Sequence, residues 1–568
     1  MAFGKEERRR LLRLLSQLYP TQTARRTLSQ LLSLVERFRA PGGLPPCWEE
    51  KDVVLISYGG GLADGGRPGL QVLDDFVAGE GLHELFSTLH ILPFFPSSSD
   101  DGFSVIDYRS VASDLGDWDD IARIRSRLHL MFDLVLNHCS RRSPWFEQYL
   151  EGRLPGLDYF IEADPGADWS QVVRPRSSPL LTPFQTSRGL RRLWTTFSED
   201  QVDLNFAQPA VLLEMLSVLL AYIERGARII RLDAVAFLWK QAGTSCLNLP
   251  QTHAVVQLMR RLVERLAPGV LLITETNLPH QQNISYFGEG DEAHLVYQFS
   301  LPPLLLDAFL NQDAGPLIEW TRHLSKPPEG SCYLNFTASH DGIGLRPLEG
   351  LVSRRRLDRL VRAAREKGGL VSQGRRPDGS QAPYELNITY RDALFGDGLE
   401  EALEVRRFLS SQALMLAFRG IPAVYFHSLV GTPNDLQGYR SSGIKRRINR
   451  HIYGLERLRR VLLRAGAQRS IYQGYRRLLE VRRSQSAFHP QGGQELWPAS
   501  RGPLFGLLRS APDHSQRLLV IVNCSARPQT LTRGRLGGDY RCDLLSGRCL
   551  EEEVRLEPFQ ALWLAEQG

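Results

Sequence analysis

Cysteine is scarce in this sequence: there are seven among 568 residues, and no two stand at Cys-x-x-Cys spacing. An odd number without that spacing argues against a disulfide framework and against a structural zinc site. We therefore expect no metal ion and no cofactor that depends on cysteine ligands.

Long apolar runs are also missing. No stretch of about 18 uncharged apolar residues occurs, so no membrane span is expected. The start, MAFGKEERRRLLRLL, has charges but no continuous apolar core, which excludes a signal peptide. The whole sequence has 69 basic and 63 acidic residues. The resulting net charge of +6 is too small to predict nucleic-acid binding. These absences predict a cytoplasmic protein without nucleic-acid or membrane partners.

The length and composition fit a folded chain with more than one part. A chain of 568 residues is too long for one compact core, and 42% hydrophobic with 23% charged residues is ordinary for a globular protein. Leucines recur at helical spacing through residues 5–38, so we expect residues 1–50 to be a helical extension. A basic amphipathic helix fits a membrane surface or a packed extension, and we favour the second. Residues 40–48, APGGLPPCW, resemble a linker.

The middle of the chain alternates short apolar runs with amphipathic helical stretches. Several of the runs are apolar on both faces, as parallel strands covered by helices are. Eight strand–helix units predict an α/β fold, a (β/α)8 TIM barrel over residues 51–484 with insertions after strands three and seven, at about 139–205 and 342–400. The eight predicted strands are 53–58, 89–95, 128–136, 227–235, 270–276, 294–299, 332–338 and 421–427.

The pattern changes near the carboxyl end. Short apolar runs such as RLLVIVNCS and ALWLAE are separated by turn residues. Residues 485–568 are therefore predicted to form a C-terminal antiparallel β domain.

Acidic residues stand at the ends of three predicted strands. Asp233 ends strand four, Glu275 ends strand five, and Asp341 follows strand seven. Carboxylates are poor strand residues, and catalytic groups of barrels lie at the carboxyl ends of the strands. Each acid alone is better explained as a helix cap or an ion pair. Three together, at the ends of strands four, five and seven, favour a catalytic cluster.

Glycoside transfer with retention uses such a cluster. One carboxylate attacks the anomeric carbon while a carboxylic acid about 5–5.5 Å away protonates the leaving oxygen. A neighbouring carboxylate raises the pKa of the acid, and that pKa falls once the nucleophile is glycosylated. The acid can then act as a base in the second step.

The order of short motifs resembles a known family. D-x-x-x-N-H (Asp133 to His138), R-x-D, T-E-T and S-H-D-G follow one another as in the α-amylase superfamily, glycoside hydrolase family 13, over about residues 50–568. The resemblance implies Asp233 as nucleophile, Glu275 as acid/base and Asp341 as stabiliser of the transition state. It also implies sugar-binding or orienting roles, for Arg231, His138 and His340.

Longer stretches resemble the sucrose phosphorylase subfamily of that family. They are HILPFFPSSSDDGFSVIDY, LDAVAFLWKQAGTS, GIPAVYFHSLVGTPND and RRINRH. The resemblance implies that Asp100 and Phe103 close on the bound glucose, that Arg450 pairs with Asp100, and that Phe197 and Gln201 line the same pocket. Without the resemblance, these residues would be a turn acid, core aromatics and a solvated arginine.

The acceptor side departs from sucrose phosphorylases. Tyr384 is retained, but Glu385 stands where those enzymes have a glutamine, which puts fructose recognition in doubt. R-P-L-E-G, with Arg346, and Y-E-L-N resemble glucosylglycerate phosphorylases of the subfamily, which convert 2-O-α-glucosylglycerate and inorganic phosphate to glucose 1-phosphate and glycerate. Arg174, Arg176 and Arg346 are candidate anion ligands; each alone is more simply a surface arginine.

Several alternatives remain open at this point. By this resemblance the glucosyl donor is 2-O-α-glucosylglycerate and the small acceptor is glycerate. Sucrose, sucrose 6′-phosphate and glucosylglycerol are the alternative donors within the subfamily. A hydrolase or transglucosidase would use the same triad, and a non-catalytic scaffold would not need it. The resemblance implies no metal and no cofactor, because His138 and His340 fit sugar ligands better than metal ligands. The sequence leaves the oligomeric state open.

Replacing the predicted nucleophile tests the first of these roles. Asp233→Asn should abolish turnover with every donor, because an amide cannot form the glycosyl ester. The measurement is glucose 1-phosphate formation, and near-normal formation by the variant removes Asp233 from this role.

Overall fold

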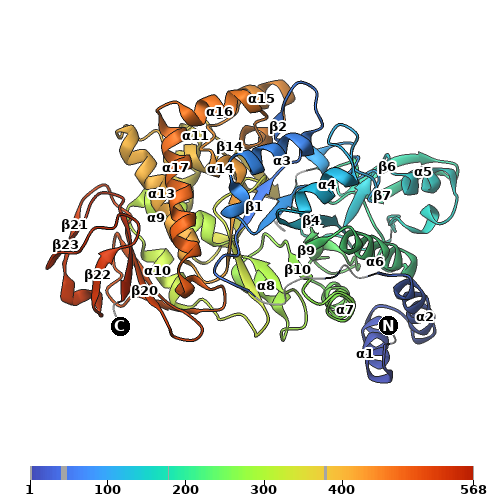
Figure 1. The fold of residues 1–568 in the computed structure, drawn as a ribbon. Coiled ribbons are helices and arrows are strands. Elements are labelled where there is room, and N and C mark those ends of the chain that lie inside the picture. Colours follow the sequence, from blue (N-terminus) through green and yellow to red (C-terminus); the bar gives the residue numbers. More distant parts are fainter. Residues whose placement is uncertain are drawn as a thin grey trace.

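The fold centres on a closed parallel barrel. A computed structural model describes residues 3–39, 42, 48–164, 166–176, 178–375 and 380–566 (Figure 1). Eight parallel strands close in the order β1-β16-β12-β11-β10-β9-β4-β3. The predicted TIM barrel is therefore confirmed, and each of the eight predicted runs overlaps one barrel strand. These strands are β1 (Val54–Ser57), β3 (Thr88–Ile91), β4 (His129–Val135), β9 (Ala227–Asp233), β10 (Leu271–Thr274), β11 (Leu295–Tyr297), β12 (Cys332–Asn335) and β16 (Ile421–Tyr425).

Burial on both faces explains why the strands have little polar alternation. All four residues of β1 and all seven of β9 are buried. Helices cover the outside of the barrel and bury the outward side chains. Those nearest the features described below are α6 (Pro209–Glu224), α7 (Pro250–Leu266), α9 (Leu301–Asn311), α10 (Gly315–Arg322), α13 (Glu401–Ala417) and α17 (Ala467–Arg483).

The first insertion follows β4, as predicted. Its first and last strands pair antiparallel, with His138 opposite Asp203 and Ser140 opposite Gln201. This pairing returns the chain to the carboxyl end of β4, so that His138 and Gln201, 63 positions apart in the sequence, lie side by side. The elements of the insertion are β5 (His138–Ser140), α5 (Pro144–Glu151), the hairpin β6 (Leu181–Thr186) and β7 (Gly189–Trp194), and β8 (Gln201–Asp203).

The second insertion follows β12, also as predicted. It folds into a three-stranded sheet in the order β13-β15-β14, with Gly344 opposite Glu385. The chain after Asp341 is thereby held beside residues 381–387. The elements are β13 (Ile343–Gly344), α11 (Arg354–Glu366), β14 (Leu370–Arg375) and β15 (Gln381–Asn387).

The carboxyl-terminal residues form the predicted antiparallel β structure. A five-stranded sheet has the order β18-β19-β20-β24-β22, and β21 pairs with β23. The sheet lies on the side of the barrel where α10 and α13 are found (Figure 1). Its strands are β18 (Gly493–Leu496), β19 (Leu504–Ser510), β20 (Arg517–Asn523), β21 (Gln529–Thr532), β22 (Tyr540–Asp543), β23 (Glu553–Leu556) and β24 (Ala561–Glu566).

The amino-terminal segment is two helices, which corrects the single helical stretch expected over 5–38. They are α1 (Lys5–Leu18) and α2 (Thr21–Glu36). Pro20 disfavours helical backbone at Tyr19, which is extended at φ −135° and ψ 154°. Most of the expected linker at 40–48 lies outside the described residues.

The two helices pack on the barrel, the interpretation favoured from the sequence. α1 contacts α7 and α2 contacts α6 (Figure 1). Leu11 and Leu15 of α1 are fully buried, and the Tyr19 hydroxyl donates to the Phe206 carbonyl oxygen at 2.9 Å. Among the described residues, no helix is long and apolar enough to cross a bilayer.

Truncating the buried face of α1 tests this packing. Leu15→Ala should weaken docking of the helix by about 2–5 kcal/mol, because it removes a fully buried side chain and leaves a cavity. Hydrogen exchange of α1 amides should then accelerate, whereas the exposed Arg13→Ala should leave it unchanged. Equal exchange rates in the two variants would contradict the packing.

Candidate active site

A pocket opens at the carboxyl ends of the barrel strands. Twelve of the residues predicted from the sequence line it. The other four predicted site residues, Arg174, Arg231, Glu385 and Arg450, do not line it. Those that do are Asp100, Phe103, His138, Arg176, Phe197, Gln201, Asp233, Glu275, His340, Asp341, Arg346 and Tyr384.

Arg231 is the centre of the carboxylate cluster. Its Nη1 donates to Asp233 Oδ1 at 2.7 Å and also binds Asp133, and its Nη2 lies 4.0 Å from Glu275 Oε2. The guanidinium is buried, so these charges are poorly screened by solvent. Arg231 therefore orients the predicted nucleophile from beneath the pocket, consistent with the orienting role expected for it.

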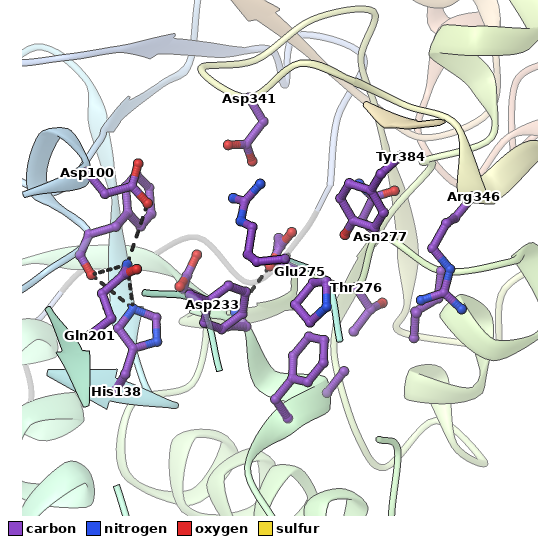
Figure 2. Close-up of a pocket in the computed structure, with 18 of the residues that line it drawn as sticks. Asp100, His138, Gln201, Asp233, Glu275, Thr276, Asn277, Asp341, Arg346 and Tyr384 are labelled. Atoms are coloured by element: carbon purple, nitrogen blue, oxygen red, sulfur yellow. Dashed lines mark hydrogen bonds between the residues drawn. The ribbon is translucent and has the colours of Figure 1, made fainter. Parts of the chain in front are cut away.

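The backbone after Asp233 links the two predicted catalytic carboxylates. Ala234 has φ 52° and ψ 26°, a left-handed conformation that is uncommon for a residue with a Cβ. In this conformation its N–H donates to Glu275 Oε2 at 3.1 Å (Figure 2). The turn that ends β9 thus holds Glu275 beside Asp233.

The two carboxyl groups favour a single shared charge. Burial raises the pKa values of both Asp233 and Glu275; the pKa of Asp233 is raised further by Glu275, and that of Glu275 by Asp341. Repulsion between neighbouring carboxylates disfavours ionisation of both groups at once. Because Arg231 donates directly to Asp233 and lies farther from Glu275, the negative charge is favoured on Asp233 and the proton on Glu275.

Asp341, unlike Glu275, is held in its ionised form. Burial alone would raise its pKa, but Arg446, Arg450 and Arg231 lower it below its usual range. Arg446 Nη1 lies 2.5 Å from Asp341 Oδ1. Asp341 is therefore ionised across the neutral range, beside a neutral His340, whose pKa is lowered by burial and by Arg450.

One end of the pocket is closed by polar groups from the first insertion and the loop after β3. Gln201 Nε2 lies 3.1 Å from His138 Nε2, 3.4 Å from the Phe103 carbonyl oxygen and 3.5 Å from Asp100 Oδ2 (Figure 2). The Phe103 ring stacks on His340 with centroids 4.7 Å apart, and Phe197 contacts His138. The structure thus brings these residues together at one end of the pocket, and their contact with glucose stays a prediction.

Arg450 pairs mainly with a different acid from the one expected. Its Nη1 lies 2.7 Å from Asp101 Oδ2 but 3.7 Å from Asp100 Oδ1. Asp100 and Asp101 both have positive φ, so the turn presents Asp100 to the pocket and Asp101 to the arginine. Arg450 lies behind the pocket, where its Nε also donates to the His340 carbonyl oxygen at 2.8 Å.

The other end of the pocket carries cations and hydroxyl donors. Figure 2 shows Tyr384, Asn277 and Arg346 on the side of the carboxylates away from Asp100 and Gln201. Burial raises the pKa of Tyr384 to about 12, so its hydroxyl stays protonated. The nearest acid to Arg346 is Glu349, 3.8 Å away. Arg176 lines the pocket, whereas Arg174 does not.

Glu385 does not face the acceptor, which corrects the expectation that it lines the pocket. Its side chain is buried and accepts two hydrogen bonds from Arg446, from Nη2 at 2.7 Å and from Nε at 3.1 Å. Because the same guanidinium pairs with Asp341, Glu385 acts on the pocket through Arg446. The pairing of Glu385 with Gly344 across β13 and β15 fixes this position.

Arg446 is the charged residue that sequence reasoning missed. It lies in the R-R-I-N-R-H stretch, where only Arg450 was assigned a role, and its neighbours made it resemble a solvated basic run. Uncharged lining residues were also missed, and most of them lie within four positions after Asp233 or Glu275. They are Ala234, Ala236, Phe237, Thr276, Asn277 and Leu278, together with Pro175. In the described part of the chain, no group of three or more His, Cys, Asp or Glu side chains is placed to hold a metal ion.

Comparisons with known proteins agree with this geometry. Residues 82–326 match the family described as Alpha amylase, catalytic domain. A glucosylglycerate phosphorylase from Spirochaeta thermophila is 44% identical over 98% of both chains, and one from Escherichia coli is 44% identical over 91% of this chain and 92% of its own. A crystal structure of sucrose 6F-phosphate phosphorylase from Thermoanaerobacter thermosaccharolyticum matches with a TM-score of 0.73 at 25% identity, over 85% of this chain and 96% of its own.

The fold and the carboxylate cluster thus define an enzyme of the α-amylase family, to which this chain belongs. Within that family it belongs to the group that contains the glucosylglycerate phosphorylases, related to sucrose phosphorylases such as that of Agrobacterium vitis, which is 32% identical over 71% of this chain and 83% of its own.

Removing the buried partner of Arg446 tests the charge balance of the pocket. Glu385→Ala should destabilise the protein by about 3–5 kcal/mol, because it leaves a buried guanidinium with one acid fewer. Glu385→Gln, which keeps one acceptor, should cost less. Glu349→Ala is the matched control. It removes an exposed and loosely paired carboxylate and should lower the free energy of unfolding by only about 0–1 kcal/mol. Thermal unfolding midpoints measure all three, and equal shifts for Glu385→Ala and Glu349→Ala would contradict the pairing.

Proposed function

We propose that the protein is a retaining glucosylglycerate phosphorylase, which converts 2-O-α-glucosylglycerate and phosphate to α-glucose 1-phosphate and glycerate. The observation that carries the proposal is the division of one pocket into a closed polar end and a cationic end, with the carboxylates between them (Figure 2). The near-full-length likeness to glucosylglycerate phosphorylases supports the choice of donor.

The closed end suits a single glucosyl unit. Asp100, Gln201 and His138 offer acceptors and donors to sugar hydroxyls, and Phe103 supplies an apolar ring. These groups would place the anomeric carbon over Asp233, and the ionised Asp341 would stabilise positive charge that develops on the ring in the transition state.

The first chemical step breaks the glucosidic bond. Asp233 attacks the anomeric carbon and forms a glucosyl ester, while Glu275 gives its proton to the departing glycerate oxygen. Arg231 keeps Asp233 charged and aimed, and the Ala234 N–H holds Glu275 in place. After glycerate leaves, Glu275 is ionised, and the negative charge of Asp233 has been consumed in the ester.

The second step uses phosphate in place of glycerate. Glu275 accepts a proton from the phosphate hydroxyl as a phosphate oxygen attacks the anomeric carbon, which releases Asp233 and gives the α-phosphate. Both acceptors are anions, so both need cations that offset desolvation. Arg346 and Arg176, with the Tyr384 hydroxyl, are the groups of the cationic end suited to this.

A donor panel tests the proposal. The enzyme is incubated with phosphate and, separately, 2-O-α-glucosylglycerate, sucrose, sucrose 6′-phosphate or glucosylglycerol, and glucose 1-phosphate is measured. We expect release from the glycerate donor to be fastest. A preference for another donor would overturn the glycerate assignment alone. Free glucose, formed equally with and without phosphate, would instead make the enzyme a hydrolase.

The acid/base residue is tested with donors that differ in leaving group. Glu275→Gln should slow cleavage of glucosylglycerate by about a hundred- to ten-thousandfold, but spare the first step with glucosyl fluoride, whose leaving group needs little protonation. In the unmodified enzyme, cleavage should be lost as pH rises through the raised pKa of Glu275, because the acid must be protonated. Equal losses with both donors in Glu275→Gln would remove the acid role.

The anion ligand is tested in the reverse direction. With glucose 1-phosphate as donor, Arg346→Ala should lower the specificity for D-glycerate about ten- to a hundredfold while leaving glycerol nearly unaffected, because a charge-assisted contact worth about 1.5–3 kcal/mol is lost. Arg192→Ala, which removes an exposed arginine of β7 outside the pocket, is the control. Equal loss with glycerate and glycerol would mean that Arg346 does not bind the carboxylate.

A further inference from the structure

A second cavity lies at the opposite end of the barrel from the pocket. Its volume is about 600 Å³, and it lies between the barrel and the carboxyl-terminal sheet. Ser331 directly precedes β12, and only Gly420 separates Arg419 from β16, so the cavity faces the amino ends of the strands. Residues 490–495, residues 510–512 and His514 contribute much of its other wall.

One cavity residue is a buried cation without a partner. The Arg419 side chain is 9% exposed, and its Nε is buried without a hydrogen-bond partner. No carboxylate among the described residues lies within ion-pair distance of it. Its backbone is fixed on both sides: its N–H donates to Gln494 Oε1 at 2.5 Å, and its carbonyl oxygen accepts from Asn335 Nδ2 at 3.1 Å. The guanidinium is therefore held against the cavity by well-bonded backbone.

Two further buried arginines stand behind Arg419. Arg509 donates to the carbonyl oxygens of Gly493, Ala417 and His489 at 2.9, 2.5 and 2.9 Å. Arg482 donates to other backbone carbonyls, and neither has an acidic partner among the described residues. Burial and then the charges of Arg482 and Arg419 lower the pKa of Arg509 to about 9. Carbonyl dipoles solvate these two guanidinium groups, and Asp52 and Glu50 offset part of the charge of Arg482. No acidic side chain among the described residues pairs with Arg509 or Arg419.

Such a region is stabilised by a bound anion. Burying a charge is unfavourable unless a counter-charge or hydrogen bonds replace the lost water; Arg419 has no acidic partner among the described residues, and its buried Nε has no hydrogen-bond partner. Exposed Glu329 and Glu495 also line the cavity, but solvent screens exposed carboxylates, and Lys326 and His514 stand at the same rim. The buried wall of the cavity is thus cationic, and the acids are confined to its exposed rim.

We propose that this cavity is a binding site for an oxyanion of the phosphate class, either inorganic phosphate or the phosphate group of a phosphomonoester. A guanidinium binds phosphate through two parallel N–H···O bonds, and a dianion offsets more positive charge than a carboxylate does. The volume exceeds that of phosphate alone, so the rest of a phosphomonoester fits as well. The site is separate from the catalytic pocket and does not depend on the proposed reaction.

Site-resolved hydrogen exchange tests the proposal on the full chain. Exchange is compared in chloride, inorganic phosphate, glucose 6-phosphate and glucose, at equal ionic strength. The ligand is added at a concentration about ten times its dissociation constant. The exchange rates of those amides in 326–331 and 490–495 that exchange only when the site opens should then fall about tenfold. Arg419→Gln should lose this effect, and the exposed Arg501→Gln, outside the cavity, should keep it. Slowing by phosphate identifies the free ion, and slowing only by glucose 6-phosphate identifies a phosphomonoester.

Arg419→Met gives an independent measurement. Because it removes an unpartnered charge, its thermal unfolding midpoint in chloride should equal or exceed that of the unmodified protein, and phosphate should add nothing to the protection of the two segments. Protection near the catalytic pocket should be the same in both proteins. Absence of slowing by either phosphate ligand in the unmodified protein, or equal slowing in Arg419→Gln, overturns the proposal.

Discussion

The salt bridge from Arg231 to Asp233 is the interaction on which the catalytic end of the barrel depends. It joins two residues of one strand, two positions apart, so both side chains point the same way into the barrel mouth. Asp133 on the neighbouring strand β4 binds the same guanidinium. The ionised acids stabilise the buried positive charge of Arg231, and Arg231 in turn keeps Asp233 ionised beside Glu275. The insertions and the arginines behind the pocket are arranged around this pair.

The two insertions complete what the barrel begins. Strands β5 and β8 bring Gln201 to His138, and β13 pairs with β15 to set Glu385 behind Arg446. Each insertion thus returns to the barrel through antiparallel pairing, and backbone hydrogen bonds fix the reach of its side chains. The pocket is therefore lined by side chains of both insertions and of the loop after β3, while Asp233 and Glu275 stand at the ends of barrel strands.

The sequence predicts the barrel well because all eight strands are apolar runs bounded by helical patterns. It predicts the carboxylates because acids at strand ends are costly there without a function. Finer contacts depend on backbone geometry that residue types do not encode. Asp100 and Asp101 are adjacent acids, and only their left-handed turn decides which one meets Arg450. Glu385 was assigned to the pocket because it stands where sucrose phosphorylases have a glutamine, but Tyr384 lines the pocket and successive residues of a strand point to opposite faces. Arg446 was missed because arginines of one basic run differ only in what packs against them.

The hydrogen bond from Ala234 to Glu275 has a consequence for how such sites are studied. The donor is a main-chain amide, so every substitution except proline preserves it chemically, provided the turn keeps its shape. Substitutions at residue 234 therefore report on the strain of the left-handed conformation and not on the hydrogen bond from its N–H to Glu275. Only replacement of that amide by an ester would isolate the contact. The coupling between the two carboxylates is consequently encoded in chain conformation, where comparisons of residue identity do not detect it.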